Sequence, residues 1–328
     1  MRPMATALAA LMSTPMLSLA PHPTPIDELT RLRAALGPAS PRLLMKRDDL
    51  LSFALGGNKV RKMQAVGAEA IAAAADTLIT CGGIQSNHAR VAAAAGAAIG
   101  MAVVLILNGD PPPEASGNLK LDRLFGADVR FVARREDRAP AMEAVAAELR
   151  AAGRRPHVIP LGASTPTGAI GFAHGVAELA STPHRPDVIA HASSSGGTQA
   201  GVLAGCALLG LRPRVIGVSA DEPAASLAET IRALLAGIAD RLGARPSSFG
   251  VENPIEVDDT QVGSGYGVPT SASIEATELL ARTEGVVLDP VYTAKAMAGL
   301  LARLRRGEFA ADQTVLFWHT GSIGYFAG

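Results

Sequence analysis

The chain has 328 residues, which is more than a typical single domain needs and enough for two domains that share a site. Hydrophobic residues make up 48% and charged residues 18%, a composition typical of a globular enzyme rather than a disordered or membrane protein. The 30 basic and 30 acidic residues cancel, so we expect no nucleic-acid partner. The chain has two cysteines, Cys81 and Cys206, in apolar or glycine-rich surroundings, which is typical of reduced thiols rather than of disulfides. We therefore expect a cytoplasmic protein.

The first residues are rich in alanine and leucine but do not form a convincing secretory signal. Pro15 interrupts the apolar run from Ala5 to Ala20, and Arg2 is the only basic residue before it. We therefore expect residues 1–15 to be a disordered extension. No later stretch reaches the roughly 20 uninterrupted apolar residues of a membrane span, so no membrane association is expected.

Helical and strand patterns alternate along the middle of the chain. The apolar spacing from Pro25 to Leu36 predicts a short amphipathic helix, and Arg42 to Lys46 predicts a strand. Seven elements then follow: helix 60–75, strand 77–80, helix 88–100, strand 101–107, helix 118–125, strand 128–132 and helix 140–152. Strands separated by helices imply an α/β fold with mainly parallel sheets and crossover connections.

A first polar segment, Gly56-Gly57-Asn58-Lys59, ends where a helical pattern begins. Glycine lets the backbone pass close to a bound group. A lysine whose ammonium is desolvated has a lowered pKa and forms a Schiff base with an aldehyde. On its own, the segment fits equally well a helix start with the solvated side chains Lys59, Arg61 and Lys62.

Two glycine-containing turns connect apolar strands to helices. After the strand ending at Thr80, Gln85-Ser86-Asn87-His88 opens an alanine-rich helix, and its free N–H groups form a natural seat for a carboxylate. After Val188 to Ala192, the loop Ser193 to Gln199 presents glycines and hydroxyls, an arrangement that binds phosphate. Ordinary helix capping is the alternative at both turns.

The order of these motifs resembles the pyridoxal-phosphate enzymes of the 1-aminocyclopropane-1-carboxylate deaminase and D-cysteine desulfhydrase family. The resemblance covers the chain from about Pro21 to Phe326 and is carried by Lys46-Arg47-Asp48-Asp49, Gly56 to Lys62, and Gln85 to His88. It implies a fold type II enzyme, similar to the tryptophan synthase β subunit, with two three-layer α/β domains. The implied large domain comprises residues 16–61 and 166–328, and the implied small domain comprises residues 62–165.

The resemblance also implies a role for each motif, with pyridoxal 5'-phosphate as cofactor, a small amino acid as substrate, no metal and a homodimeric assembly. The implied catalytic residues are Lys59, Ser86, Tyr266 and Tyr292. The implied cofactor-binding residues are Asn58, Lys59, Asn87, Ser194, Ser195, Gly196, Gly197, Thr198 and Thr320. The implied substrate-binding residues are Gln85, Ser86, Asn87, His88 and Thr293.

Two positions favour the desulfhydrase branch of the family. The deaminases carry glutamate and leucine where this chain has Thr293 and Thr320, so we expect β-elimination from D-cysteine or a related amino acid to pyruvate, ammonia and sulfide. Deamination of 1-aminocyclopropane-1-carboxylate to 2-oxobutyrate, release of sulfite from cysteate, and a non-catalytic cofactor-binding protein are the alternatives. Ala294 and Ser322 replace glycines of the desulfhydrases and could narrow the pocket.

Overall fold

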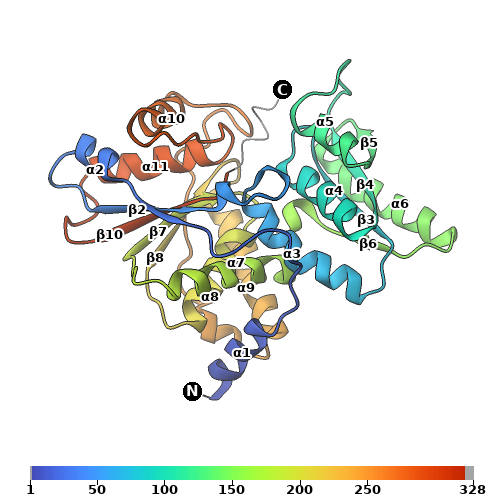
Figure 1. The fold of residues 1–328 in the computed structure, drawn as a ribbon, viewed down its shortest axis with the longest axis horizontal. Helices are drawn as coiled ribbons and strands as arrows, with labels where there is room; N and C mark the ends of the chain where they lie inside the picture. Colours follow the sequence, from blue (N-terminus) through green and yellow to red (C-terminus); the bar gives the residue numbers. More distant parts are fainter. Residues whose placement is uncertain (1, 322–328) are drawn as a thin grey trace.

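The computed structural model describes residues 2–321, which form two α/β units around two separate sheets (Figure 1). The strands are β1 Ile26–Glu28, β2 Arg42–Arg47, β3 Thr77–Gly83, β4 Ala102–Asn108, β5 Asp128–Val132, β6 Pro156–Val158, β7 Val188–Ser193, β8 Arg214–Ser219, β9 Glu256–Asp258 and β10 Thr314–His319. The α-helices are α1 Arg2–Met12, α2 Thr30–Leu36, α3 Asn58–Ala72, α4 Asn87–Ile99, α5 Gly117–Leu124, α6 Arg138–Ala151, α7 Pro166–Ala180, α8 Gly197–Leu208, α9 Ala224–Arg241, α10 Ser271–Glu284 and α11 Thr293–Arg305. Among the helices of residues 2–321, none is both long and apolar enough to cross a membrane.

The larger sheet has six strands in the order β1-β2-β10-β7-β8-β9. Only the β1–β2 pair is antiparallel, with Ile26 opposite Lys46. The single helix predicted from Pro25 to Leu36 is therefore wrong in its first half, because residues 26–28 pair with β2 and only Thr30–Leu36 is helical. Backbone hydrogen bonds to a neighbouring strand outweigh the helical spacing of so short a segment.

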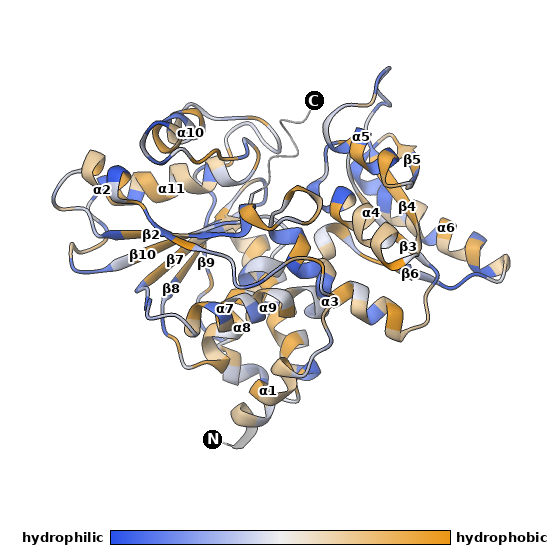
Figure 2. Ribbon diagram, in the orientation of Figure 1, coloured by the Kyte–Doolittle hydropathy of each residue, from blue (hydrophilic) through white to orange (hydrophobic). Residues whose placement is uncertain are grey.

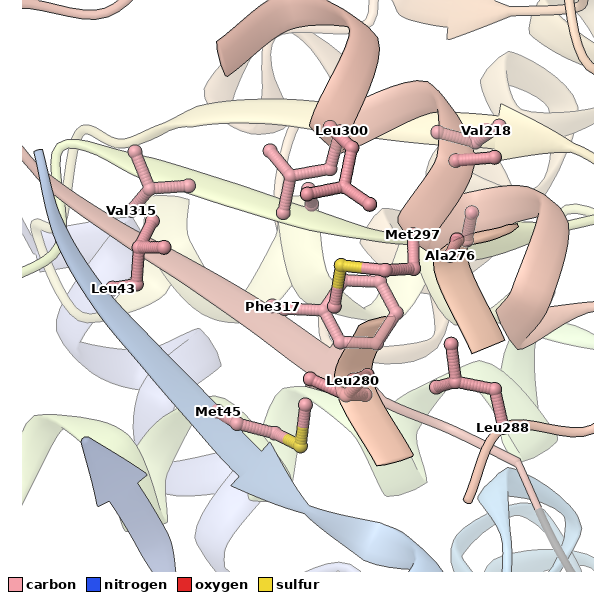
Figure 3. Close-up of a cluster of buried hydrophobic side chains, with 14 of the residues drawn as sticks. Leu43, Met45, Val218, Ala276, Leu280, Leu288, Met297, Leu300, Val315 and Phe317 are labelled. Carbon is pink, nitrogen blue, oxygen red and sulfur yellow. The ribbon is translucent and has the colours of Figure 1, made fainter. Parts of the chain in front are cut away.

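Successive side chains of the central strands point to opposite faces of the large sheet, so the core has two layers, one on each face. In β10, the odd-numbered residues Val315 and Phe317 pack against helices α10 and α11 in a cluster whose labelled side chains converge in Figure 3. The even-numbered residues of β10, Leu316 and Trp318, pack against α7 and α8 on the opposite face. Helices on both faces bury the parallel strands completely, which explains why these strands read as continuous apolar runs.

The smaller sheet has four parallel strands in the order β5-β4-β3-β6. Side chains of α3 and α4 cover one face, with Leu78 and Leu105 from the strands. Residues of α6 cover the other face, with Ile79 and Val104. The proposed small domain, residues 62–165, encloses this whole sheet.

The N-terminal segment is helical and not disordered as expected. Residues 2–12 form α1, and Ala7 and Leu11 are fully buried in a cluster with residues of α7 and α8. The prediction of a disordered extension over residues 1–15 is therefore wrong for this helix. Its apolar run serves to cover α7 and α8, because burying such side chains is favourable by about 25 cal/mol per Å².

Candidate active site

Two adjoining cavities lie where the carboxyl ends of the strands of both sheets meet. The cavities share Lys59, Asn87, Ser194, Ser195 and Tyr292, so they form one continuous site. The inner cavity is further lined by Asn58, Ala192, Ser193, Gly196, Thr198, Thr320 and Gly321. The outer cavity is further lined by Gly82, Gly83, Ser86, His88, Asn108, Arg135, Arg138, Leu161, Gly162, Asp221 and Tyr266. Crevices at the carboxyl ends of parallel strands are the usual ligand sites of α/β folds.

Lys59 stands in the first turn of α3, at the junction of three segments. The backbone N–H of Asn58 donates to the carbonyl of Thr320 over 3.0 Å, and its amide Nδ2 donates to Thr198 Oγ1 over 3.1 Å. Burial lowers the pKa of Lys59 to about 8, although the Asp221 carboxylate acts in the opposite direction. A lysine with so low a pKa is partly neutral near pH 7 and is available as a nucleophile.

The loop before α8 forms the floor of the inner cavity. Gly196 adopts a left-handed conformation with φ 77°, and within the described residues no side chain caps the first N–H groups of α8. These N–H donors suit a phosphate group. Behind the loop, Ser195 Oγ lies 2.7 Å from Ser164 Oγ, which accepts a hydrogen bond of 2.9 Å from Lys62 Nζ.

Gly162 leaves open the space beside Lys59 that a bound cofactor needs. Its φ is +69°, and a Cβ there would lie 3.3 Å from Lys59 Nζ and 2.7 Å from Ser195 Oγ. A side chain at this position would therefore fill the space between the lysine and the uncapped turn. The residues that surround this space fit an aldehyde that also carries a phosphate, as pyridoxal phosphate does.

Asn87 is held in one orientation by two residues that the sequence did not single out for the site. Its Oδ1 accepts hydrogen bonds from Arg90 Nη1 over 2.8 Å and from Asn118 Nδ2 over 2.9 Å. Arg90 Nη1 also donates to Asn118 Oδ1 over 2.7 Å. With Oδ1 engaged twice, the amide N–H groups are the part of Asn87 directed away from these residues. Arg90 and Asn118 are thus positioning residues for Asn87, and only its neighbours in space identify them.

Ser86, His88 and Gln85 occupy three different environments around the start of α4. Ser86 lines the outer cavity, and its Oγ also accepts from the backbone N–H of Ala89 over 3.2 Å, so it caps the helix as well. Gln85 lies outside the lining of both cavities, and its Oε1 accepts from the backbone N–H of Asn118 over 2.8 Å. The structure therefore gives Gln85 a supporting position beside the site rather than a place in its wall.

His88 is buried in the wall of the outer cavity as a neutral ring. Thr80 Oγ1 donates to the carbonyl of Ile159 over 2.8 Å, so the 2.7 Å contact between Thr80 Oγ1 and His88 Nε2 requires the histidine to donate. Burial and the charges of Lys59 and Lys62 hold the pKa of His88 well below its usual range. A neutral histidine whose proton is on Nε2 is a fixed wall residue and not an acid.

Tyr266 and Tyr292 form a pair, and Asp289 positions one member of that pair. The two hydroxyl groups lie 2.6 Å apart, and burial raises the pKa of both tyrosines. Asp289 Oδ1 accepts the backbone N–H of Tyr292 over 2.7 Å. Thr293 directs its hydroxyl to the Asp289 carboxylate and is fully buried, so the structure does not bring Thr293 into either cavity. Ala294 packs in the core between the six-stranded sheet and helices α10 and α11, and Ser322 lies outside the described residues.

A buried ionic network explains Lys46 and Asp48 of the Lys46-Arg47-Asp48-Asp49 motif. Arg61, two residues after Lys59, donates to Asp48 Oδ2 over 2.7 Å and to Glu178 Oε1 over 2.6 Å. Lys46 Nζ donates to Glu178 Oε2 over 2.8 Å, and Trp318 Nε1 donates to Asp48 Oδ2 over 2.8 Å. Figure 2 shows hydrophilic residues at the start of α3, and two of these, Arg61 and Lys62, are buried. The network fixes the turn of α3 that carries Lys59.

The fold and the site together define an enzyme that uses pyridoxal phosphate, and comparison with known proteins agrees. The family model "Pyridoxal-phosphate dependent enzyme" matches residues 17–321, and the chain belongs to this family. It is similar to D-cysteine desulfhydrase of Salmonella newport (strain SL254), with 38% identity over 315 residues and 94% of each chain covered. The corresponding protein of Salmonella typhi is 37% identical over the same length, again with 94% of each chain covered.

Solved structures give the same result. An ACC deaminase homologue has a TM-score of 0.89 at 33% identity, covering 98% of this chain and 96% of its own. Threonine deaminase isoform 2 of Solanum lycopersicum has a TM-score of 0.72 at 16% identity, covering 97% of this chain and 89% of its own, and shows the fold alone. The expected fold type II architecture and the expected cofactor are confirmed.

Proposed function

We propose that the protein eliminates the β-substituent and the amino group of D-cysteine or a related β-substituted amino acid, giving pyruvate, ammonia and sulfide. The observation that carries the choice of elimination is Thr320, which lines the inner cavity with Lys59 and is 5% exposed. A hydroxyl is neutral at this wall and cannot act as an acid toward a ring nitrogen. The similarity to D-cysteine desulfhydrases over 94% of the chain supports the same choice.

The cofactor, when bound, withdraws electrons from the α-carbon of the substrate. Lys59 would hold it through Nζ, and Asn58, Asn87 and the loop Ser194 to Thr198 would surround its ring and phosphate. The amine of Lys59, with its pKa of about 8, is suited to remove the proton at the α-carbon of the substrate.

The start of α4 and the tyrosine pair would hold the two ends of the substrate. Ser86 and the N-terminus of α4 suit the substrate carboxylate, because the free N–H groups of a helix start favour an anion. Tyr266 and Tyr292 stay protonated near neutral pH because the pKa of each is raised. One hydroxyl can therefore donate a hydrogen bond toward the leaving group while it accepts one from the other hydroxyl. His88 remains a wall residue in this scheme.

We further infer a homodimer that works in the cytoplasm, as the family resemblance implies. Two buried cysteines without a disulfide, Cys81 and Cys206, support a reducing compartment. Sedimentation of the purified holoenzyme at twice the mass of one chain would support the dimer. A monomer at assay concentration would contradict it.

A product assay separates the proposed function from its alternatives. The purified holoenzyme is incubated with the D and L forms of cysteine and cysteate and with 1-aminocyclopropane-1-carboxylate, and pyruvate, sulfide, sulfite and 2-oxobutyrate are measured. We expect pyruvate and sulfide in equal amounts from one form of cysteine. Predominant 2-oxobutyrate would identify a deaminase, predominant sulfite a cysteate lyase, and no product from any substrate a non-catalytic binding protein.

A further inference from the structure

The outer cavity contains a carboxylate that the proposed chemistry does not use. Asp221 follows the carboxyl end of β8, and its side chain is 5% exposed. Its Oδ2 lies 3.3 Å from Arg135 Nη2, whereas its buried Oδ1 accepts no hydrogen bond from any residue between 2 and 321. A buried acceptor without a donor is costly, so a donor on a bound ligand would be favourable here.

Asp221 is close to the reacting part of the site rather than to its rim. Its charge acts on Lys59, where it opposes the effect of burial, and it raises the pKa of both Tyr266 and Tyr292. Arg135 of the small domain reaches across to it and lies 5.5 Å from the centre of the Tyr266 ring. The carboxylate, the arginine and the tyrosine pair thus form one part of the wall of the outer cavity.

We propose that Asp221 determines which β-substituent the site accepts. Its Oδ1 accepts a hydrogen bond from a neutral substituent that carries a donor, such as a thiol, a hydroxyl or an amide, and its charge repels an anionic substituent such as a sulfonate or carboxylate. This inference rests on the proposed function, because it assumes that the substrate carboxylate lies at the start of α4 and its side chain extends toward Tyr266.

Arg138 is the residue that would favour an anionic β-substituent over a neutral one. It also lines the outer cavity, and its Nε donates to the carbonyl of Arg135 over 2.9 Å. Its charge acts on the thiol of Cys81, in β3, whereas the charge of Asp221 acts on Lys59. Arg138 is thus the arginine toward β3 and Asp221 the carboxylate toward Lys59, and we place the substituent beside Asp221.

Binding of two amino acids of nearly equal shape tests the inference without any elimination. The holoenzyme is titrated with D-aspartate and D-asparagine, and then with the L forms, while the visible absorption of the cofactor is followed. We expect asparagine to bind at least about tenfold more tightly than aspartate, because its amide N–H can donate to the unpartnered Oδ1 of Asp221 whereas a carboxylate cannot. Asp221→Asn should reduce that ratio at least about tenfold.

Two control variants separate a local effect from a general one. Glu222→Gln removes a charge from the next residue, which does not belong to the described lining of the outer cavity, and should leave the ratio unchanged. Arg138→Gln should also leave asparagine the preferred ligand. Equal binding of the two ligands by the unmodified protein, or an unchanged ratio in Asp221→Asn, would overturn the inference. Neither ligand has a leaving group, so failure of cysteine to give pyruvate would refute the proposed function and not this result.

Discussion

Replacing Asp48 by asparagine removes one charge from the network that fixes α3 and should strongly destabilise the protein. Asp48 is completely buried, and its two oxygens accept from Arg61 over 2.7 and 2.8 Å and from Trp318 Nε1 over 2.8 Å. Without the Asp48 charge, Glu178 alone faces both Arg61 and Lys46, so one buried positive charge is uncompensated, and breaking a buried pair in this way costs about 3 to 5 kcal/mol. The asparagine keeps one acceptor oxygen, so we expect a loss of about 3 kcal/mol in the free energy of unfolding.

Chemical denaturation of the apoprotein measures this loss, with an exposed pair as the matched control. Glu28 accepts from Arg42 over 2.7 Å, but their side chains are 38% and 42% exposed, so Glu28→Gln should cost no more than about 1 kcal/mol. Burial tends to raise the pKa of Asp48, but Arg61 lowers it below its usual value. The difference between wild type and Asp48→Asn should therefore be full above about pH 4 and should shrink at lower pH. A loss no larger than that of Glu28→Gln would refute the reasoning.

Three further predictions concern the lysine and the glycine cradle. Lys59→Ala should abolish the borohydride-trapped adduct with the cofactor, and an adduct of unchanged yield would place the covalent link elsewhere. Because burial lowers the pKa of Lys59 to about 8, the rate at which the apoprotein binds the cofactor should rise with pH up to that value. Asp221 stabilises the ammonium form of Lys59, so Asp221→Asn should shift this rise to lower pH. Gly162→Ala should lower the cofactor content of the purified protein. The control Gly100→Ala has a similar φ of +73° but open space around it, so it should only cost about 1 kcal/mol of stability. Equal cofactor content in both variants would contradict the placement of the cofactor beside Gly162.

The sequence predicted most of what local pattern determines. Strands β3, β4, β5 and β7 follow from apolar runs, and the start of α4 follows from Ser86 and the residues after it. The pattern failed where tertiary packing decides the outcome. Residues 26–28 pair with β2 although their spacing is helical, and α1 is ordered because α7 and α8 bury Ala7 and Leu11.

The site divides in the same way. Motif residues such as Lys59, Asn87 and Thr320 could be selected along the chain, and the structure brings them to one pair of cavities. Asp221 and Arg135 could not be selected, because each lies in a short charged segment outside the motifs and the two side chains meet only in the folded structure. Thr293 shows the converse, since its place in a family motif does not reveal that Asp289 holds its hydroxyl.

A competition assay tests the central claim most directly. The holoenzyme is given equal concentrations of D-cysteine and 1-aminocyclopropane-1-carboxylate, and the initial rates of pyruvate and 2-oxobutyrate formation are measured in the same tube. With Thr320 in the wall beside Lys59, pyruvate should form faster and should be matched by an equal amount of sulfide. Faster formation of 2-oxobutyrate would contradict the assignment to β-elimination.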